Sequence, residues 1–205
     1  MKKRNKIIII SLIIIFILIS IIIGGYFLLN KKETKTNTPL IINEIKDYNY
    51  KLKDNDSKIY KDLFKELKKE LKKELDNKEV NEEKYVKLIS KMFIMDFYTL
   101  DNKIDNTDIG GEMFLEESII SNFKLKASET LYKYVESDIY HDRVQELPIV
   151  SDVVIDKVET IKFLEDLKAF KVECSIKYVK DLKYKDKTSL IFIHKDKKLV
   201  LVEII

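Results

Sequence analysis

The sequence predicts an α+β protein in which an N-terminal transmembrane helix precedes three helices packed on an antiparallel sheet of about four strands. Three observations support this prediction. Residues 7–29 contain no charged side chain, apolar residues recur at helical spacing between residues 58 and 137, and apolar and polar residues alternate from residue 150 onward. Short connections between the last strands favour an antiparallel meander with one face covered by the helices.

The predicted membrane anchor is residues 7–29. As a helix this run would be about 35 Å long, enough to cross a hydrocarbon core of about 30 Å. The alternative is a cleaved signal peptide, but that needs a shorter apolar region and a small-residue cleavage site, whereas the chain continues Gly24-Gly25-Tyr26. The sequence therefore favours a retained anchor that contacts membrane lipid.

The flanking charges predict the orientation of this anchor. Residues 1–6 carry four basic side chains and the segment after the anchor carries Lys31, Lys32 and Lys35. The slight excess on the N-terminal side favours a cytoplasmic segment 1–6 and an external C-terminal domain. We expect a polar stalk at residues 30–43 and a single extracytoplasmic α+β domain at residues 44–205.

The charge of the chain divides unevenly. Residues 1–35 carry a net charge of +6, so the remainder of this +3 chain carries −3. A slightly acidic surface of mixed sign argues against nucleic-acid binding, which needs a basic face.

The domain begins with a predicted half-buried strand at residues 44–53, where Tyr48, Tyr50 and Leu52 alternate with polar residues. The first helix is predicted at residues 58–75, with leucines repeating every four residues. Asn81 is a typical N-cap for a second helix that extends to about Leu100. A polar loop at residues 101–111 leads to a third helical region at about residues 115–137.

The last part of the chain predicts strands. One begins at Val153 and extends to about Phe163. The clearest alternation covers residues 170–178, where Phe170, Val172, Cys174 and Ile176 share one face. Residues 188–194 and 199–204 predict two more strands joined by a charged turn.

Two segments carry a resemblance to a known family. They are the block FIMDFYTL at residues 93–100 and the end of the chain from YVKDLKY at residues 178–184 to LVLVE at residues 199–203. With this order of elements, the chain resembles the nuclear-transport-factor-two-like superfamily. The resemblance implies a cone in which the helices pack into the concave face of a curved sheet. Tethered domains of this kind occur in bacterial conjugation and type IV secretion scaffolds, although the strand at residues 44–53 departs from the usual order.

Asp96 is the first candidate functional residue. Helical spacing places it at the centre of the apolar face of the second helix. A carboxylate at such a position must accept hydrogen bonds, form an ion pair or have a raised pKa. One interpretation is an acid or base in a pocket with Tyr98, Tyr134 and Arg143. The favoured interpretation is a structural carboxylate bound by a tyrosine hydroxyl, by Arg143 or by backbone amides.

We interpret the other chemically reactive residues as structural. Cys174 could act as a nucleophile with His141 or His194, but its position on the apolar face of a strand favours core packing. His141, Asp142 and Arg143 are interpreted as residues that order a loop. No cofactor fingerprint and no metal-ligand spacing is present in the sequence.

The sequence therefore favours a single-pass membrane protein with an extracytoplasmic binding or assembly domain, without catalytic function, in a cell-envelope complex. We expect a protein partner or a second copy of the chain to bind this domain. The alternative is a membrane-tethered enzyme or small-ligand binder with a pocket around Asp96.

Overall fold

The computed structural model describes residues 41–45, 48, 50–53 and 58–205 of the chain. Residues Ile41–Ile205 form one compact unit. No helix in this described part is long and apolar enough to cross a bilayer. The predicted cytoplasmic segment, the anchor at residues 7–29 and the stalk up to residue 40 lie outside the described residues.

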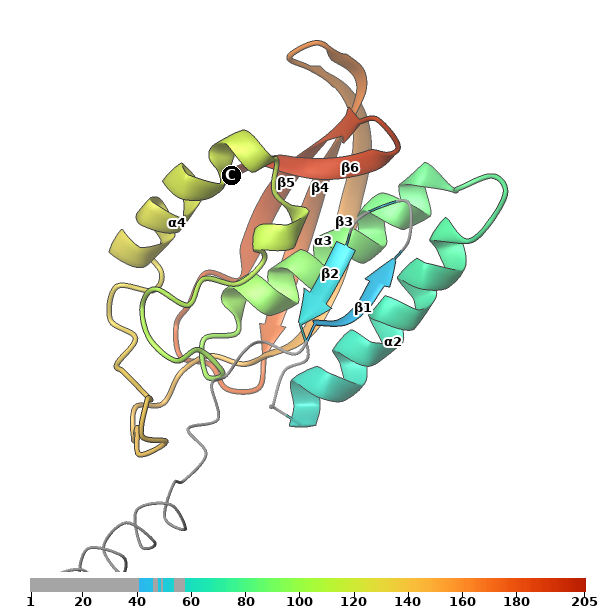
Figure 1. Cartoon of the computed structure of the whole chain (residues 1–205). Helices are drawn as coiled ribbons and strands as arrows, with labels where there is room; N and C mark the ends of the chain where they lie inside the picture. Colours follow the sequence, from blue (N-terminus) through green and yellow to red (C-terminus); the bar gives the residue numbers. More distant parts are fainter. Residues whose placement is uncertain (1–40, 46–47, 49, 54–57) are drawn as a thin grey trace, which may run out of the picture. The chain divides into compact units, whose positions relative to one another are not determined.

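The described part of the chain is α+β, with three α-helices and a four-stranded antiparallel sheet (Figure 1). The helices are α2 (Lys58–Leu75), α3 (Glu82–Tyr98) and α4 (Ile120–Glu129). Two short 3-10 helices, η1 (Glu112–Phe114) and η2 (Glu117–Ile119), precede α4. A separate two-stranded sheet contains β1 (Ile41–Ile45) and β2 (Tyr50–Lys53).

The main sheet is a meander in the order β3-β4-β5-β6. Its strands are β3 (Val150–Phe163), β4 (Asp166–Tyr178), β5 (Lys187–Lys195) and β6 (Lys198–Ile204). One row of partners crosses all four strands and consists of Val158, Val172, Leu190 and Ile204. The predicted antiparallel meander is confirmed, because each strand pairs with its sequence neighbour; two-residue turns join β3 to β4 and β5 to β6.

α3 is the central helix of the unit. Asn81 caps it, since its side chain accepts a hydrogen bond from the Lys84 backbone N–H at 2.9 Å. Twelve of its seventeen residues are buried, because α2 covers one side of α3 while β3 and β4 cover the other (Figure 1). The sequence predicted α2 with its observed bounds and α3 with an end two residues further on.

The third predicted helix is shorter than expected. The sequence predicts helix over residues 115–137, whereas α4 ends at Glu129 and turns follow. The Thr130 hydroxyl donates to the Lys126 carbonyl at 2.6 Å and the Ser128 hydroxyl donates to the Leu125 carbonyl at 2.8 Å. Such side-chain hydrogen bonds compete with the helical backbone pattern, in agreement with a helix that ends at Glu129 with Thr130 as its C-cap.

The first predicted strand is also different. The sequence predicts one strand at residues 44–53, whereas the structure has a hairpin of β1 and β2 whose first strand begins at Ile41. Apolar and polar residues alternate with a period of two in both strands of a hairpin. The apolar pattern therefore does not show where the chain reverses direction between the two strands. Tyr50 connects this hairpin to the sheet: its side chain is fully buried and its hydroxyl donates to the Leu199 carbonyl at 3.0 Å.

One continuous apolar core lies between the helices and the sheet. The alternating residues of β4 enter it as predicted, and they are Phe170, Val172, Cys174 and Ile176. Cys174 is 1% exposed and unpaired, and burial raises the pKa of its thiol to about 12. A thiol in this state is a packing group, in agreement with the favoured interpretation of the sequence.

Candidate functional site

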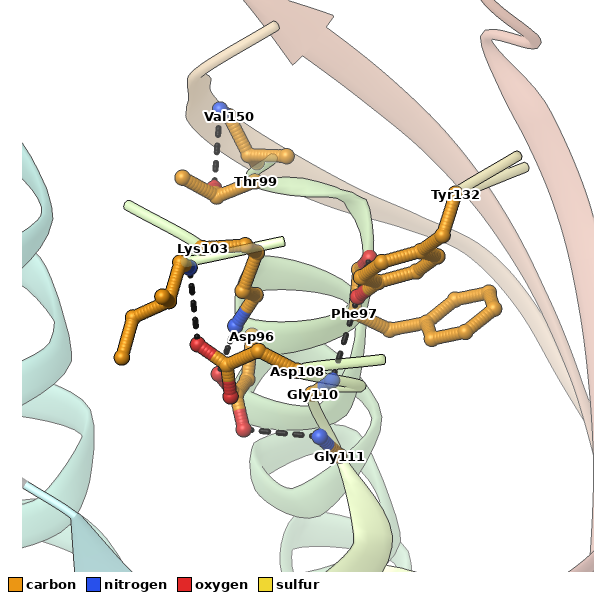
Figure 2. A network of polar contacts seen from close by, with 10 residues as sticks. Asp96, Phe97, Thr99, Lys103, Asp108, Gly110, Gly111, Tyr132 and Val150 are labelled. Atoms are coloured by element: carbon orange, nitrogen blue, oxygen red, sulfur yellow. Dashed lines mark hydrogen bonds and ion pairs between the residues drawn. The ribbon is translucent and has the colours of Figure 1, made fainter. Parts of the chain in front are cut away.

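Asp96 lies in the last turn of α3 and is 8% exposed. Its carboxylate forms an ion pair with the Lys103 Nζ at 2.9 Å and accepts a hydrogen bond from the Gly111 backbone N–H at 2.7 Å (Figure 2). Lys103 itself is only 5% exposed. The carboxylate is therefore held by a buried cation from one side of the loop at residues 101–111 and by a backbone amide from its other end.

Two glycines allow this loop to approach α3 closely. A Cβ atom on Gly110 would lie 2.1 Å from the Asp96 carbonyl oxygen and 2.8 Å from the Lys103 Nζ. Gly111 has a φ of +80°, and a Cβ there would lie 2.6 Å from the Phe93 ring. Glycine is needed at both positions, at the first for space and at the second for backbone conformation as well.

Tyr132 completes the arrangement from the segment after α4. Its hydroxyl donates to the Phe97 carbonyl at 2.7 Å and accepts from the Gly110 backbone N–H at 3.1 Å (Figure 2). The Phe97 carbonyl is one of the acceptors that the end of a helix leaves without an intrahelical partner. Burial raises the pKa of the Tyr132 phenol well above its ordinary value, so it stays a neutral donor.

A second connection joins the end of α3 to the sheet. The Thr99 hydroxyl oxygen accepts from the Val150 backbone N–H at 3.1 Å, and the Leu100 N–H donates to the Pro148 carbonyl at 2.9 Å. We call the contacts of Asp96, Lys103, Gly110, Gly111 and Tyr132 the α3-end network. It joins α3, the following loop and the segment after α4 to one another.

The Asp96 carboxylate in the α3-end network is bound by groups of the protein itself. Both members of its ion pair are buried, and the carboxylate already accepts from two donors. A buried charge needs a partner of this kind, and the favoured structural interpretation of Asp96 agrees with the geometry. Backbone amides were among the partners that the sequence predicted for the Asp96 carboxylate, and the structure has the Gly111 N–H in this role. The counter-ion Lys103 was not identified from the sequence, because a lysine in a polar loop gives no sign that it will be buried.

The four residues of the predicted pocket do not converge on one site. Asp96 lies in the α3-end network, while the Tyr98 hydroxyl donates to Thr188 Oγ1 on β5 at 3.4 Å. Tyr134 is 74% exposed. Arg143 donates to the backbone carbonyls of Lys103, Asp101 and Glu136, at 2.8, 2.6 and 3.0 Å.

The histidines do not form a catalytic pair with Cys174. His141 is exposed, has a φ of 57° and lies in the loop that Arg143 orders. His194 lies at the end of β5, where its Nδ1 is 2.8 Å from Asp166 and its Nε2 is 3.3 Å from Glu82. Within the described residues, no group of three or more His, Cys, Asp or Glu side chains is arranged to hold a metal ion.

A groove between α4 and β6 was not identified from the sequence. It has a volume of about 550 Å³. Phe97, Tyr98, Leu115 and Leu201 form its floor, and each is at most 6% exposed. The half-buried Phe123 and Leu131 are among its walls. No sequence pattern could have indicated this groove, because its lining comes from four separate segments of the chain.

The rim of this groove is polar and carries two lysines. Lys126 lies on α4, Lys185 lies in the segment between β4 and β5, and Glu203 lies at the same rim. Among the residues that the structure describes, neither lysine forms an ion pair or a side-chain hydrogen bond. The α4–β6 groove therefore combines an apolar interior with two lysine ammonium groups that have no side-chain partner in the described part of the chain.

Comparison with models of known protein families, with curated proteins and with solved structures finds no match to this chain.

Proposed function

We propose that the chain is a single-pass membrane protein whose folded unit is an extracytoplasmic binding or assembly domain, without catalytic function, in a cell-envelope complex. The uncharged run at residues 7–29 supports the membrane anchor. The basic residues before it support a cytoplasmic N-terminus.

The observation that carries the binding role is an exposed apolar loop at residues 134–144, between α4 and β3. Four of its side chains are largely exposed: Tyr134 (74%), Ile139 (61%), Tyr140 (85%) and Val144 (95%). Exposed apolar patches often mark binding surfaces, and these four side chains lie within eleven consecutive residues of one loop. Tyrosine, present here as Tyr134 and Tyr140, is also enriched where binding energy is concentrated in protein–protein interfaces.

Hydrogen bonds hold the apolar loop in place. Besides the three carbonyls that Arg143 binds, the Asp138 N–H donates to the Ile104 carbonyl at 2.7 Å. The Gln145 side chain accepts from the Glu136 N–H and donates to the Tyr134 carbonyl, at 2.9 and 2.7 Å. A loop ordered before binding loses less conformational entropy when a partner docks. This order supports a binding surface rather than a passive connection.

The order of the elements supports a relation to tethered nuclear-transport-factor-two-like domains. Three helices followed by an antiparallel meander agree with the architecture that this resemblance implies. The hairpin of β1 and β2 is additional to that order. We propose the relation as an architectural one and assign no residue role from it.

No observation favours the alternative of an enzyme with a pocket around Asp96. Lys103 and Gly111 bind the carboxylate, and Asp96 does not line the α4–β6 groove. A binding role therefore agrees better with the observed geometry than an acid–base role does.

A photo-crosslinking experiment on the full chain tests the binding role. A photoreactive phenylalanine analogue replaces Tyr140 in the apolar loop, and Glu129, an exposed position on α4, provides the matched control. We expect a discrete crosslinked product with a second envelope protein or a second copy of the chain from position 140 and none from position 129. Equal products from both positions, or none from either, would contradict the proposal.

Cysteine labelling in intact cells tests the orientation. Cys174 is buried and its thiol pKa is about 12, so an introduced exposed cysteine should react selectively. A membrane-impermeant maleimide should label the Tyr140→Cys variant in intact cells, and the Lys2→Cys variant only after permeabilisation. Labelling of both variants in intact cells would contradict an N-terminus in the cytoplasm.

A further inference from the structure

We infer that the α4–β6 groove binds a single-chain anionic amphiphile, such as a long-chain fatty acid. The inference rests on the described residues of the groove and does not depend on the membrane anchor. A volume of about 550 Å³ lies within the range of small-molecule binding sites in proteins.

The interior of the groove matches a hydrocarbon chain. The polar atoms that accompany its floor residues already have partners: the Tyr98 hydroxyl donates to Thr188, the Phe97 carbonyl accepts from Tyr132, and the Leu201 carbonyl accepts from the Glu116 N–H. A hydrocarbon chain brings no hydrogen-bonding groups that would need further partners in this interior.

The rim predicts the charge of the ligand. Lys126 and Lys185 carry two positive charges against the single negative charge of Glu203. A carboxylate headgroup at this rim could form charge-assisted hydrogen bonds to the two ammonium groups. A cationic headgroup would be repelled, and a neutral one would gain less.

The test uses the full chain reconstituted in nanodiscs of phosphatidylcholine. The probe is a long-chain fatty acid with a photoreactive diazirine near the end of its alkyl chain, and mass spectrometry locates the adducts. We expect adducts at Phe97, Phe123 or Leu201 that unlabelled laurate competes away. Adducts in residues 7–29 report simple partitioning into the bilayer and should not saturate.

Charge-reversed variants and competitors with different headgroups distinguish specific binding from non-specific hydrophobic contact. The charge reversal Lys126→Glu/Lys185→Glu should reduce groove labelling about tenfold, because charge-assisted hydrogen bonds are lost. The matched control Lys162→Glu/Lys168→Glu, at the exposed tip of the β3–β4 hairpin, should leave it unchanged. Dodecanol should compete about tenfold less well than laurate, and dodecyltrimethylammonium should not compete.

Three results would overturn the inference: adducts confined to residues 7–29, groove labelling that does not saturate, or equal labelling in the two charge-reversed proteins. If the chain stays outside the nanodiscs and its groove is still labelled, the membrane placement fails and the groove inference stands. The two proposals can therefore fail separately.

Discussion

Consecutive residues at the end of α3 belong to two regions of opposite character. The Asp96 side chain enters the α3-end network, while Phe97 and Tyr98 form part of the floor of the α4–β6 groove. The network is polar, closed and internally bonded, whereas the groove is apolar, open and has cations at its rim. A carboxylate on an apolar helix face can therefore serve the architecture of the fold, whereas the rim lysines of the groove have no side-chain partner among the described residues.

The largest expected effect comes from breaking the closed region. Asp96→Ala leaves the Lys103 ammonium buried without its counter-ion, and it should lower the free energy of unfolding by about 3–5 kcal/mol. Urea unfolding of the full chain in detergent, followed by tyrosine fluorescence, measures this change. The double variant Asp96→Ala/Lys103→Met removes both charges and should recover a substantial part of the loss. A single variant as stable as the natural chain would show that the pair is not buried as described.

Adding a methyl group to the glycine turn of the network should have the next largest effect. Gly110→Ala would place a Cβ against the Asp96 carbonyl, and Gly111→Ala would also strain a residue with positive φ. Each should cost about 1–3 kcal/mol in the same unfolding experiment. Ser121→Ala, at an exposed position of α4 beside the groove, should change stability by less than about 0.5 kcal/mol. Equal effects at all three positions would remove the distinction between the two regions.

Removing one tyrosine hydroxyl from each region compares the two regions directly. Tyr132→Phe removes a donor to the Phe97 carbonyl and an acceptor for the Gly110 N–H, and it should cost about 2 kcal/mol. Tyr98→Phe removes a long hydrogen bond of 3.4 Å beneath the groove and should cost about 0.5 kcal/mol. Thermal or urea unfolding of both variants measures the difference. A larger loss from Tyr98→Phe would reverse the ranking of the two regions.

The smallest predicted effect is a loss of folding stability at acidic pH, which arises from the Glu116 carboxyl on the groove side. Hydrogen bonds from Lys195 and Ser118 lower the pKa of the Glu116 carboxyl from 4.5 to about 2, although partial burial acts in the opposite direction. A depressed folded-state pKa contributes stability above pH 4.5 that is lost as the pH falls towards 2. For a pair near the surface we expect this contribution to be about 1 kcal/mol.

The variant Glu116→Gln removes that titration. Its stability should lie below that of the natural chain at pH 6 and should converge with it as the pH falls towards 2, in urea unfolding at several pH values. Glu129→Gln, which removes an exposed carboxylate on α4, is the matched control. A difference between the natural chain and Glu116→Gln that stays constant with pH would contradict the lowered pKa.

Local sequence signals predicted many of the elements because their causes are local. The four-residue leucine repeat predicted α2, and the Asn81 cap predicted the beginning of α3. The alternation in β4 predicted its buried face, including Cys174. The predictions failed where local patterns do not distinguish the outcomes, at the hairpin of β1 and β2 and at the end of α4.

The candidate site divides in the same way. The sequence placed Asp96 on an apolar helix face and required a partner for it, because an unpaired buried carboxylate is too costly. It could not identify Lys103 as that partner, separate Tyr134 and Arg143 from Asp96, or locate the α4–β6 groove. These features depend on which distant segments pack together, and a pattern of period two or 3.6 describes only the faces that an element presents. The elements and their apolar faces followed from the order of the residues, while tertiary packing decided which of the described polar groups have a partner and which do not.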